Sequence, residues 1–165
     1  MSIITLNGIS KVYRTKEIET TALENVNLKV EKGEFISIMG PSGCGKSTLL
    51  NIIGLLDKPT TGNVELLGKD CSKMNDTELA HFRNLNVGFV FQSFHLIQSL
   101  NVAANVELSL VYRSGVSAHE RKERVEEVLK RLEMLHRIKH LPSQLSGGQC
   151  QRVAIARAII GAPDI

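Results

Sequence analysis

Several features that would place this chain in a special class of protein are absent from its sequence. No apolar run among the 165 residues approaches the length of a membrane span. Met1–Thr5 lack the pattern of a signal peptide, and internal repeats and low-complexity segments are absent. With 42% hydrophobic and 22% charged residues, the composition favours one soluble globular unit that can bury a core and resides in the cytosol.

The net charge and the number of cysteines are also small. A formal net charge of +3 is too small to indicate a nucleic-acid partner. The three cysteines are an odd number, and no pair has the C-x-x-C spacing. The sequence therefore predicts reduced thiols and argues against a zinc site.

The most informative segment, residues 40–47, reads G-P-S-G-C-G-K-S. It follows the apolar run 35–39, which we expect to be a buried strand, and leads into residues 48–53, which we expect to be helical. Glycines let such a turn direct successive N–H groups inward onto phosphate oxygens, toward which the helix also directs its positive end. A plain glycine-rich turn is the alternative. The setting instead predicts a nucleoside triphosphate site formed by Gly40, Pro41, Ser42, Gly43, Cys44, Gly45, Lys46, Ser47 and Thr48, with Lys46 on the β- and γ-phosphates and Ser47 on Mg²⁺.

A second motif, Leu145-Ser146-Gly147-Gly148-Gln149, precedes a stretch with helical periodicity. Ser146 can cap that helix, and the glycines leave N–H groups bare at its start. Taken alone, the motif is explained by a capped helix with a flexible start.

Together the two motifs resemble the ATP-binding subunits of ABC transporters, in which L-S-G-G-Q is the family's own motif. The resemblance covers essentially the whole chain and implies an α/β fold of the ABC-type P-loop NTPases. It implies an N-terminal antiparallel β subdomain and P-loop core over residues 1–93, and a helical subdomain with L-S-G-G-Q over residues 94–160. It also implies ATP and Mg²⁺ as cofactors and ATPase activity in the complete protein.

The resemblance assigns further roles residue by residue. Tyr13 matches the aromatic that stacks on adenine, and Gln92 matches a glutamine that helps to hold Mg²⁺ and acts with Lys46 in catalysis. Ser146, Gly147, Gly148 and Gln149 match the motif that completes the ATP site of a second copy of the subunit. The second partner that the resemblance implies is a transmembrane permease subunit. The chain would then be a peripheral protein on the cytoplasmic side of the cell membrane, and no nucleic-acid partner is expected.

The amino-acid sequences of three segments indicate one branch of this family. Residues 37–43, 51–62 and 87–92 are similar to the branch that drives lipoprotein release, macrolide export and antimicrobial-peptide resistance. Gln98, Ala104 and Cys150 stand where relatives usually carry Pro, Glu and Gln. Gln98 and Ala104 fall in the region that faces the membrane partner in the family, so they bear on which permease is bound.

Sequence patterns also predict individual elements. Strands are expected over 3–12, 22–30 and 63–67, with further apolar strands at 35–39 and 87–91. Asn75-x-x-Glu78 and Ser117-x-x-Glu120 are predicted to cap helices. One face of the second helix would carry Val125, Val128, Leu129, Leu132 and Leu135.

The last residues, 162–165, fall where relatives begin the strand that ends in a magnesium-organising Asp, followed by the Glu that activates water. We therefore expect the N-terminal portion of a longer subunit, which by itself binds ATP better than it hydrolyses it. A truncated, catalytically inactive fragment is one alternative. Another is a non-transport ABC ATPase of DNA repair or translation, but the interval between Gln92 and Gln149 has no room for the inserted modules of those proteins.

Overall fold

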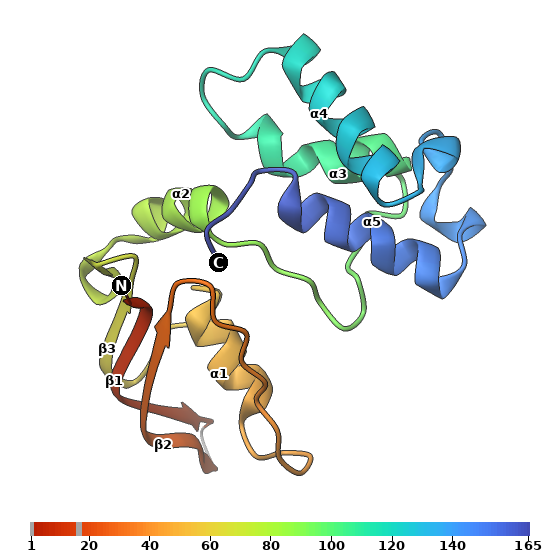
Figure 1. The fold of residues 1–165 in the computed structure, drawn as a ribbon. Helices are drawn as coiled ribbons and strands as arrows, with labels where there is room; N and C mark the ends of the chain where they lie inside the picture. Colours follow the sequence, from red (N-terminus) through yellow and green to blue (C-terminus); the bar gives the residue numbers. More distant parts are fainter. Residues whose placement is uncertain (1, 16–17) are drawn as a thin grey trace. The chain divides into compact units, whose positions relative to one another are not determined.

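The computed structural model describes residues 2–15 and 18–165. Its helices and strands, drawn in Figure 1, are β1 (Ser2–Arg14), β2 (Glu19–Glu31), α1 (Lys46–Ile53), β3 (Thr61–Leu66), β4 (Lys69–Asp70), η1 (Cys71–Lys73), α2 (Asp76–Asn86), α3 (Val102–Val111), α4 (Ala118–Arg131), η2 (Leu135–Arg137), η3 (Pro142–Gln144) and α5 (Gly147–Ile159). The chain divides into two compact units, Met1–Ala80 and His81–Ile165. The subdomain boundary at residues 93 and 94 stays a prediction.

An antiparallel sheet with strand order β2-β1-β3-β4 forms the first unit. Leu6 of the central strand β1 pairs with Leu28 on one side and Val64 on the other. Because side chains alternate between the faces of a strand, Ile4 and Leu6 are both buried on one face. The expected strands at 3–12, 22–30 and 63–67 are confirmed, although β3 already ends at Leu66.

Helix α1 supplies the other apolar layer of the first unit, because it buries Leu49, Ile52 and Ile53 along one side. Full burial of such a side chain contributes about 1.5–3 kcal/mol. Helix α1 is only eight residues long, so we attribute its stability to this packing rather than to helix propensity. The packing therefore holds the helix in place in the first unit.

Three helices, α3, α4 and α5, build the core of the second unit around Val106, Leu129 and Val153, each fully buried. The predicted apolar face of α4 is confirmed for Val125, Val128 and Leu129. It is wrong for Leu135, which lies in η2 and is 38% exposed. The helix ends at Arg131, so its periodicity does not extend to that residue.

Both predicted capping residues act as such. Asn75 and Glu78 exchange hydrogen bonds, the Asn75 N–H donating to Oε2 at 2.8 Å and the Glu78 N–H to Oδ1 at 3.0 Å. Ser117 Oγ accepts from the Glu120 N–H at 3.2 Å. The Ser117 half of this predicted cap is therefore confirmed. The Glu120 carboxylate pairs with Arg124 at 2.5 Å.

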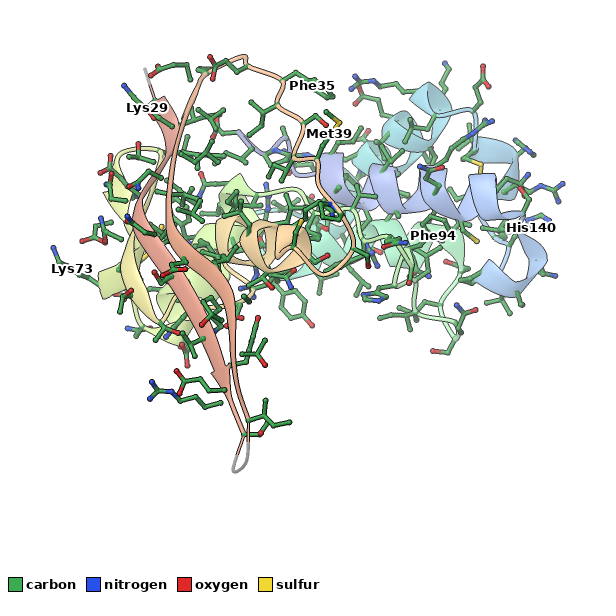
Figure 2. All side chains as sticks on the ribbon, turned by 90° about the horizontal axis from the view of Figure 1, so that it is seen from below. Lys29, Phe35, Met39, Lys73, Phe94 and His140 are labelled. Atoms are coloured by element: carbon green, nitrogen blue, oxygen red, sulfur yellow. The ribbon has the colours of Figure 1, made fainter. Side chains whose placement is uncertain are left out.

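The predicted strands at 35–39 and 87–91 are wrong, since within residues 2–15 and 18–165 neither segment joins a ladder. Figure 2 labels Phe35 and Met39 on the segment between β2 and α1; their side chains are 96% and 86% exposed. Hydrophobicity identifies a segment that suits a sheet, but a ladder also requires a paired neighbour. Near the second segment, the Gly88 N–H donates to the Ile165 carbonyl at 2.8 Å and the Ile165 N–H to that of Asn86 at 3.0 Å, which is the pattern of parallel strands.

A charged cluster ties β1 to the segment that follows α1. Lys11 Nζ lies 2.6 Å from Asp57 Oδ1, and the Tyr13 hydroxyl donates to Asp57 Oδ2 at 2.9 Å. Burial by itself would raise the pKa of Asp57, but hydrogen bonds from Lys11, Tyr13 and the backbone N–H of Lys58 outweigh it and lower the pKa. The folded chain therefore favours the ionised carboxylate.

Replacing Asp57 with Asn should lower the free energy of unfolding by about 1 kcal/mol near neutral pH. A carboxylate whose pKa is lowered by folding stabilises the protein above its unfolded pKa, and this contribution is lost as the pH falls through the folded value. The difference between wild type and Asp57→Asn should therefore be full at pH 7 and shrink below about pH 4. Urea unfolding at both pH values measures it. Glu19→Gln, which removes an exposed ion pair with Arg14, is the control. If wild type and Asp57→Asn differ equally in unfolding free energy at both pH values, the lowered pKa of Asp57 is contradicted.

Candidate functional site

The glycine-rich turn 40–45 leads directly into α1, and Gly45 fixes how it does so. Gly45 is the N-cap residue and has φ 91°, in the left-handed region that favours glycine. A Cβ built on it would lie 2.3 Å from the carbonyl oxygen of Ala22 and 2.9 Å from Leu23 Cδ2. The turn thus approaches β2 so closely that a side chain at Gly45 would displace backbone.

The N-terminus of α1 carries no capping side chain and no acidic residue in its first turn. Backbone N–H groups at such a helix start lack intrahelical partners, and the helix dipole adds partial positive charge there. Ser47, in the first turn, is exposed. This end of α1 therefore suits an anion, and the Ser47 hydroxyl is accessible beside it.

Lys46 brings a full positive charge to the same turn. Its Nζ donates to the carbonyl oxygens of Gly40 at 2.9 Å and Pro41 at 2.7 Å, and lies 3.5 Å from Cys44 Sγ. The ammonium is thus held against the turn 40–44. A ligand with several negative oxygens, such as a polyphosphate, fits this combination of one cation and an uncapped helix start.

Tyr13 lies on β1, in the same unit as the turn, and is 44% exposed. Its hydroxyl is fixed by Asp57, and Lys11 Nζ stands 5.0 Å from its ring centroid. These contacts orient an accessible aromatic ring, which is a suitable surface for stacking. Sequence reasoning missed Asp57 as a partner of Tyr13, because no local pattern pairs residues 44 positions apart. It also missed Lys11, although Lys11 lies two positions before Tyr13 on the same strand, a spacing that places both side chains on one face.

Gln92 lies in the second unit, at the corner of a tight turn. The Phe94 N–H donates to the Phe91 carbonyl at 3.0 Å, so Gln92 and Ser93 are the two central residues of the turn. Both are exposed. The turn therefore presents the Gln92 side chain to solvent.

Ser146–Gln149 form the start of α5, also in the second unit. Ser146 Oγ accepts from the Gln149 N–H at 3.3 Å, which confirms the predicted cap. Gln149 Oε1 in turn accepts from the Ser146 N–H at 2.9 Å. Sequence reasoning missed this reciprocal bond, although the S-x-x-Q spacing of a capping box signals it.

The two glycines of this motif differ from Gly45. Gly147 and Gly148 are exposed, and a Cβ on either would meet nothing within 4 Å. Glycine in a helix is less favourable than alanine by about 1 kcal/mol. The packing of this chain therefore gives no reason for glycine at these positions.

In the ranges 2–15 and 18–165, no cluster of three or more His, Cys, Asp or Glu side chains could hold a metal ion. No helix among these same residues is long and apolar enough to cross a membrane.

Comparison with known proteins identifies the family. Residues 23–165 match the family described as ABC transporter. The chain is 48% identical over 163 residues to the ABC transporter ATP-binding protein YknY of Bacillus subtilis, covering 99% of this chain and 70% of that protein. It is 42% identical to the macrolide export ATP-binding/permease protein MacB of Hahella chejuensis, covering 99% of this chain and 25% of that protein.

A solved structure supports the same conclusion. The ATP-binding cassette MJ0796 of Methanocaldococcus jannaschii, described in a dimeric post-hydrolysis state with ADP and Pi, has a TM-score of 0.90 and 50% identity. The match covers 97% of this chain and 70% of the MJ0796 chain. The chain thus belongs to the ABC transporter family, as an ATP-binding subunit similar to the macrolide-export type, and it has the ABC-type P-loop fold.

Proposed function

We propose that this chain binds Mg·ATP through residues 40–48. The observation that carries the proposal is the uncapped start of α1 with the Lys46 ammonium held against the adjoining turn. Lys46 and the backbone N–H groups would hold the phosphates, and the Ser47 hydroxyl would contribute a ligand to Mg²⁺. Bound Mg²⁺ neutralises charge that develops during phosphoryl transfer.

The remaining site residues have complementary roles in this proposal. Tyr13 offers its ring to the adenine, with Lys11 and Asp57 keeping the ring in place. Gln92, exposed at its turn, supplies a further oxygen to Mg²⁺ and acts with Lys46 in ATP hydrolysis.

A second copy of the subunit is proposed to complete each site through Ser146, Gly147, Gly148 and Gln149. The open space around the two glycines supports this, because close approach by a partner gives a reason for glycine where the chain itself gives none. The solved MJ0796 cassette is described as dimeric. Hydrolysis would then drive a transmembrane permease, with the subunit peripheral on the cytoplasmic side of the membrane; the relative MacB carries the name ATP-binding/permease protein.

Lys46→Ala should abolish Mg·ATP binding, which we expect in the micromolar to millimolar range for the wild type. The lysine ammonium is the full positive charge held against the turn, and its loss leaves phosphate charge uncompensated. Isothermal titration calorimetry of the complete gene product measures the affinity. Lys29→Ala, which removes an exposed lysine paired with Glu31, is the matched control. Equal affinity in Lys46→Ala and wild type would refute the proposed site.

Mixing two inactive variants tests whether the site is shared between copies. Ser146→Arg should bind ATP nearly normally yet fail to dimerise with it, because a bulky cation fills the space for the γ-phosphate, whereas Lys46→Ala fails at binding. A mixed dimer then has one site with both lesions and one with neither, so mixing should restore part of the ATPase activity. If both motifs act within one chain, mixing restores nothing.

Gly148→Asp should separate folding from function. Asp in the first turn suits the helix dipole and has better helix propensity than glycine, so thermal unfolding should occur at the same or a higher temperature. ATP-driven dimerisation, followed by size-exclusion chromatography with light scattering, should be lost because the carboxylate repels the γ-phosphate. Gly148→Ser is the uncharged control. A variant that dimerises like wild type would contradict the proposed role of Gly148.

A further inference from the structure

Arg157 of α5 donates hydrogen bonds to the turn that carries Gln92, whose Phe94 also packs against the core of the second unit. Arg157 Nη1 donates to the carbonyl oxygen of His95 at 2.7 Å, and Nη2 donates to that of Phe94 at 2.6 Å. The planar guanidinium thus contacts two successive carbonyls with its two terminal nitrogens. A lysine ammonium lacks this fixed two-pronged geometry.

The backbone that Arg157 contacts is strained. Phe94 has φ 58° and His95 has φ 46°, both in the left-handed region, and neither is glycine. The His95 N–H donates to the Ser93 carbonyl at 2.6 Å, and its ring stacks on Phe91 with centroids 4.6 Å apart. Such a conformation persists only where the surrounding structure holds it. The two hydrogen bonds from Arg157 provide such a hold.

Arg157 is half-buried, and burial lowers the pKa of its guanidinium. Among the described residues the guanidinium has no carboxylate partner, and it donates to the carbonyl oxygens of Phe94 and His95. Removing a guanidinium from water is unfavourable unless its donors are used. The two carbonyl oxygens therefore satisfy donors that burial has withdrawn from water.

A second helix holds the other end of the same loop. Asn105 of α3 is fully buried; its Oδ1 accepts from the Ile97 N–H at 2.8 Å and its Nδ2 donates to the Leu100 carbonyl at 2.9 Å. Residues 94–100 are thus fixed from α5 and α3, while Gln92 and Ser93 remain exposed beyond the fixed part.

We propose that Arg157 is a positioning residue that acts through Gln92, locking the turn 91–95 to α5 so that Gln92 and the Ser146–Gln149 motif at the other end of that helix move as one body. The proposal rests on the proposed role of Gln92 in holding Mg²⁺. Arg157 lies near the C-terminal end of α5, away from the motif at its start, and its guanidinium contacts the carbonyl oxygens of Phe94 and His95.

The test uses the complete gene product and three variants of one helix. Arg157→Gln removes the charged fork, and Arg157→Lys keeps the charge without the fork. Arg152→Gln is the matched control, because Arg152 also lies on α5, is exposed and contacts Glu133 at 3.5 Å. Arg157→Gln should lower the kcat for ATP about tenfold and raise the half-saturating Mg²⁺ concentration severalfold, with the KM for ATP within about twofold. Arg157→Lys should be intermediate, and Arg152→Gln should match wild type.

A double-mutant cycle with Gln92→Ala decides whether the effect passes through Gln92. In that background Arg157→Gln should change the Mg²⁺ dependence and kcat by no more than about twofold. Full additivity, or an Arg157→Gln variant that behaves like Arg152→Gln, would overturn the proposal. If Arg157→Gln does not fold, the same cycle with Arg157→Lys decides.

Hydrogen exchange without nucleotide gives a readout that does not depend on activity. Amides of residues 93–97 should exchange faster in Arg157→Gln than in Arg152→Gln, and Gln92→Ala should leave them unchanged. Unchanged exchange in Arg157→Gln would also overturn the proposal. Failure of the proposed function would look different from either the kinetic or the exchange result. In that case calorimetry would show that the wild-type protein itself does not bind Mg·ATP.

Discussion

The close approach of Gly45 to the carbonyl of Ala22 is the constraint on which the candidate site depends. It fixes where α1 begins relative to β2, and therefore where the uncapped N–H groups and the Lys46 ammonium lie. Packing of Leu49, Ile52 and Ile53 holds the rest of the helix. A short helix with a weak tendency to form alone thus becomes a rigid support for a charged turn.

Two cationic side chains with proposed roles, Lys46 and Arg157, donate to backbone carbonyl oxygens. Lys46 donates to Gly40 and Pro41, and Arg157 to Phe94 and His95. A carboxylate would neutralise the cation, whereas a carbonyl fixes its position and leaves the net charge. For Lys46 this preserves attraction for phosphate. For Arg157 it lets the side chain order a strained turn.

The sequence sufficed to predict what depends on neighbours along the chain. The antiparallel strands, the caps at Asn75, Ser117 and Ser146, and the buried face of α4 all follow from local spacing. The segments 35–39 and 87–91 could not be predicted this way, because a strand depends on a paired neighbour and not on its own hydrophobicity. The contacts of Tyr13 with Asp57 and of Arg157 with Phe94 join residues distant in sequence, and no local pattern indicates them.

Glycine is present for different physical reasons in the turn 40–45 and in the motif 146–149. Gly45 is required by the chain itself, through its positive φ and the nearby backbone of β2. Gly147 and Gly148 have open space around them, so their lack of a side chain benefits no contact within residues 2–15 and 18–165. A helix start that forgoes both propensity and side-chain packing is best explained by something that must approach its backbone closely. We therefore base the proposed role of Gly147 and Gly148 toward a second copy on this open space as well as on the resemblance to the family's motif.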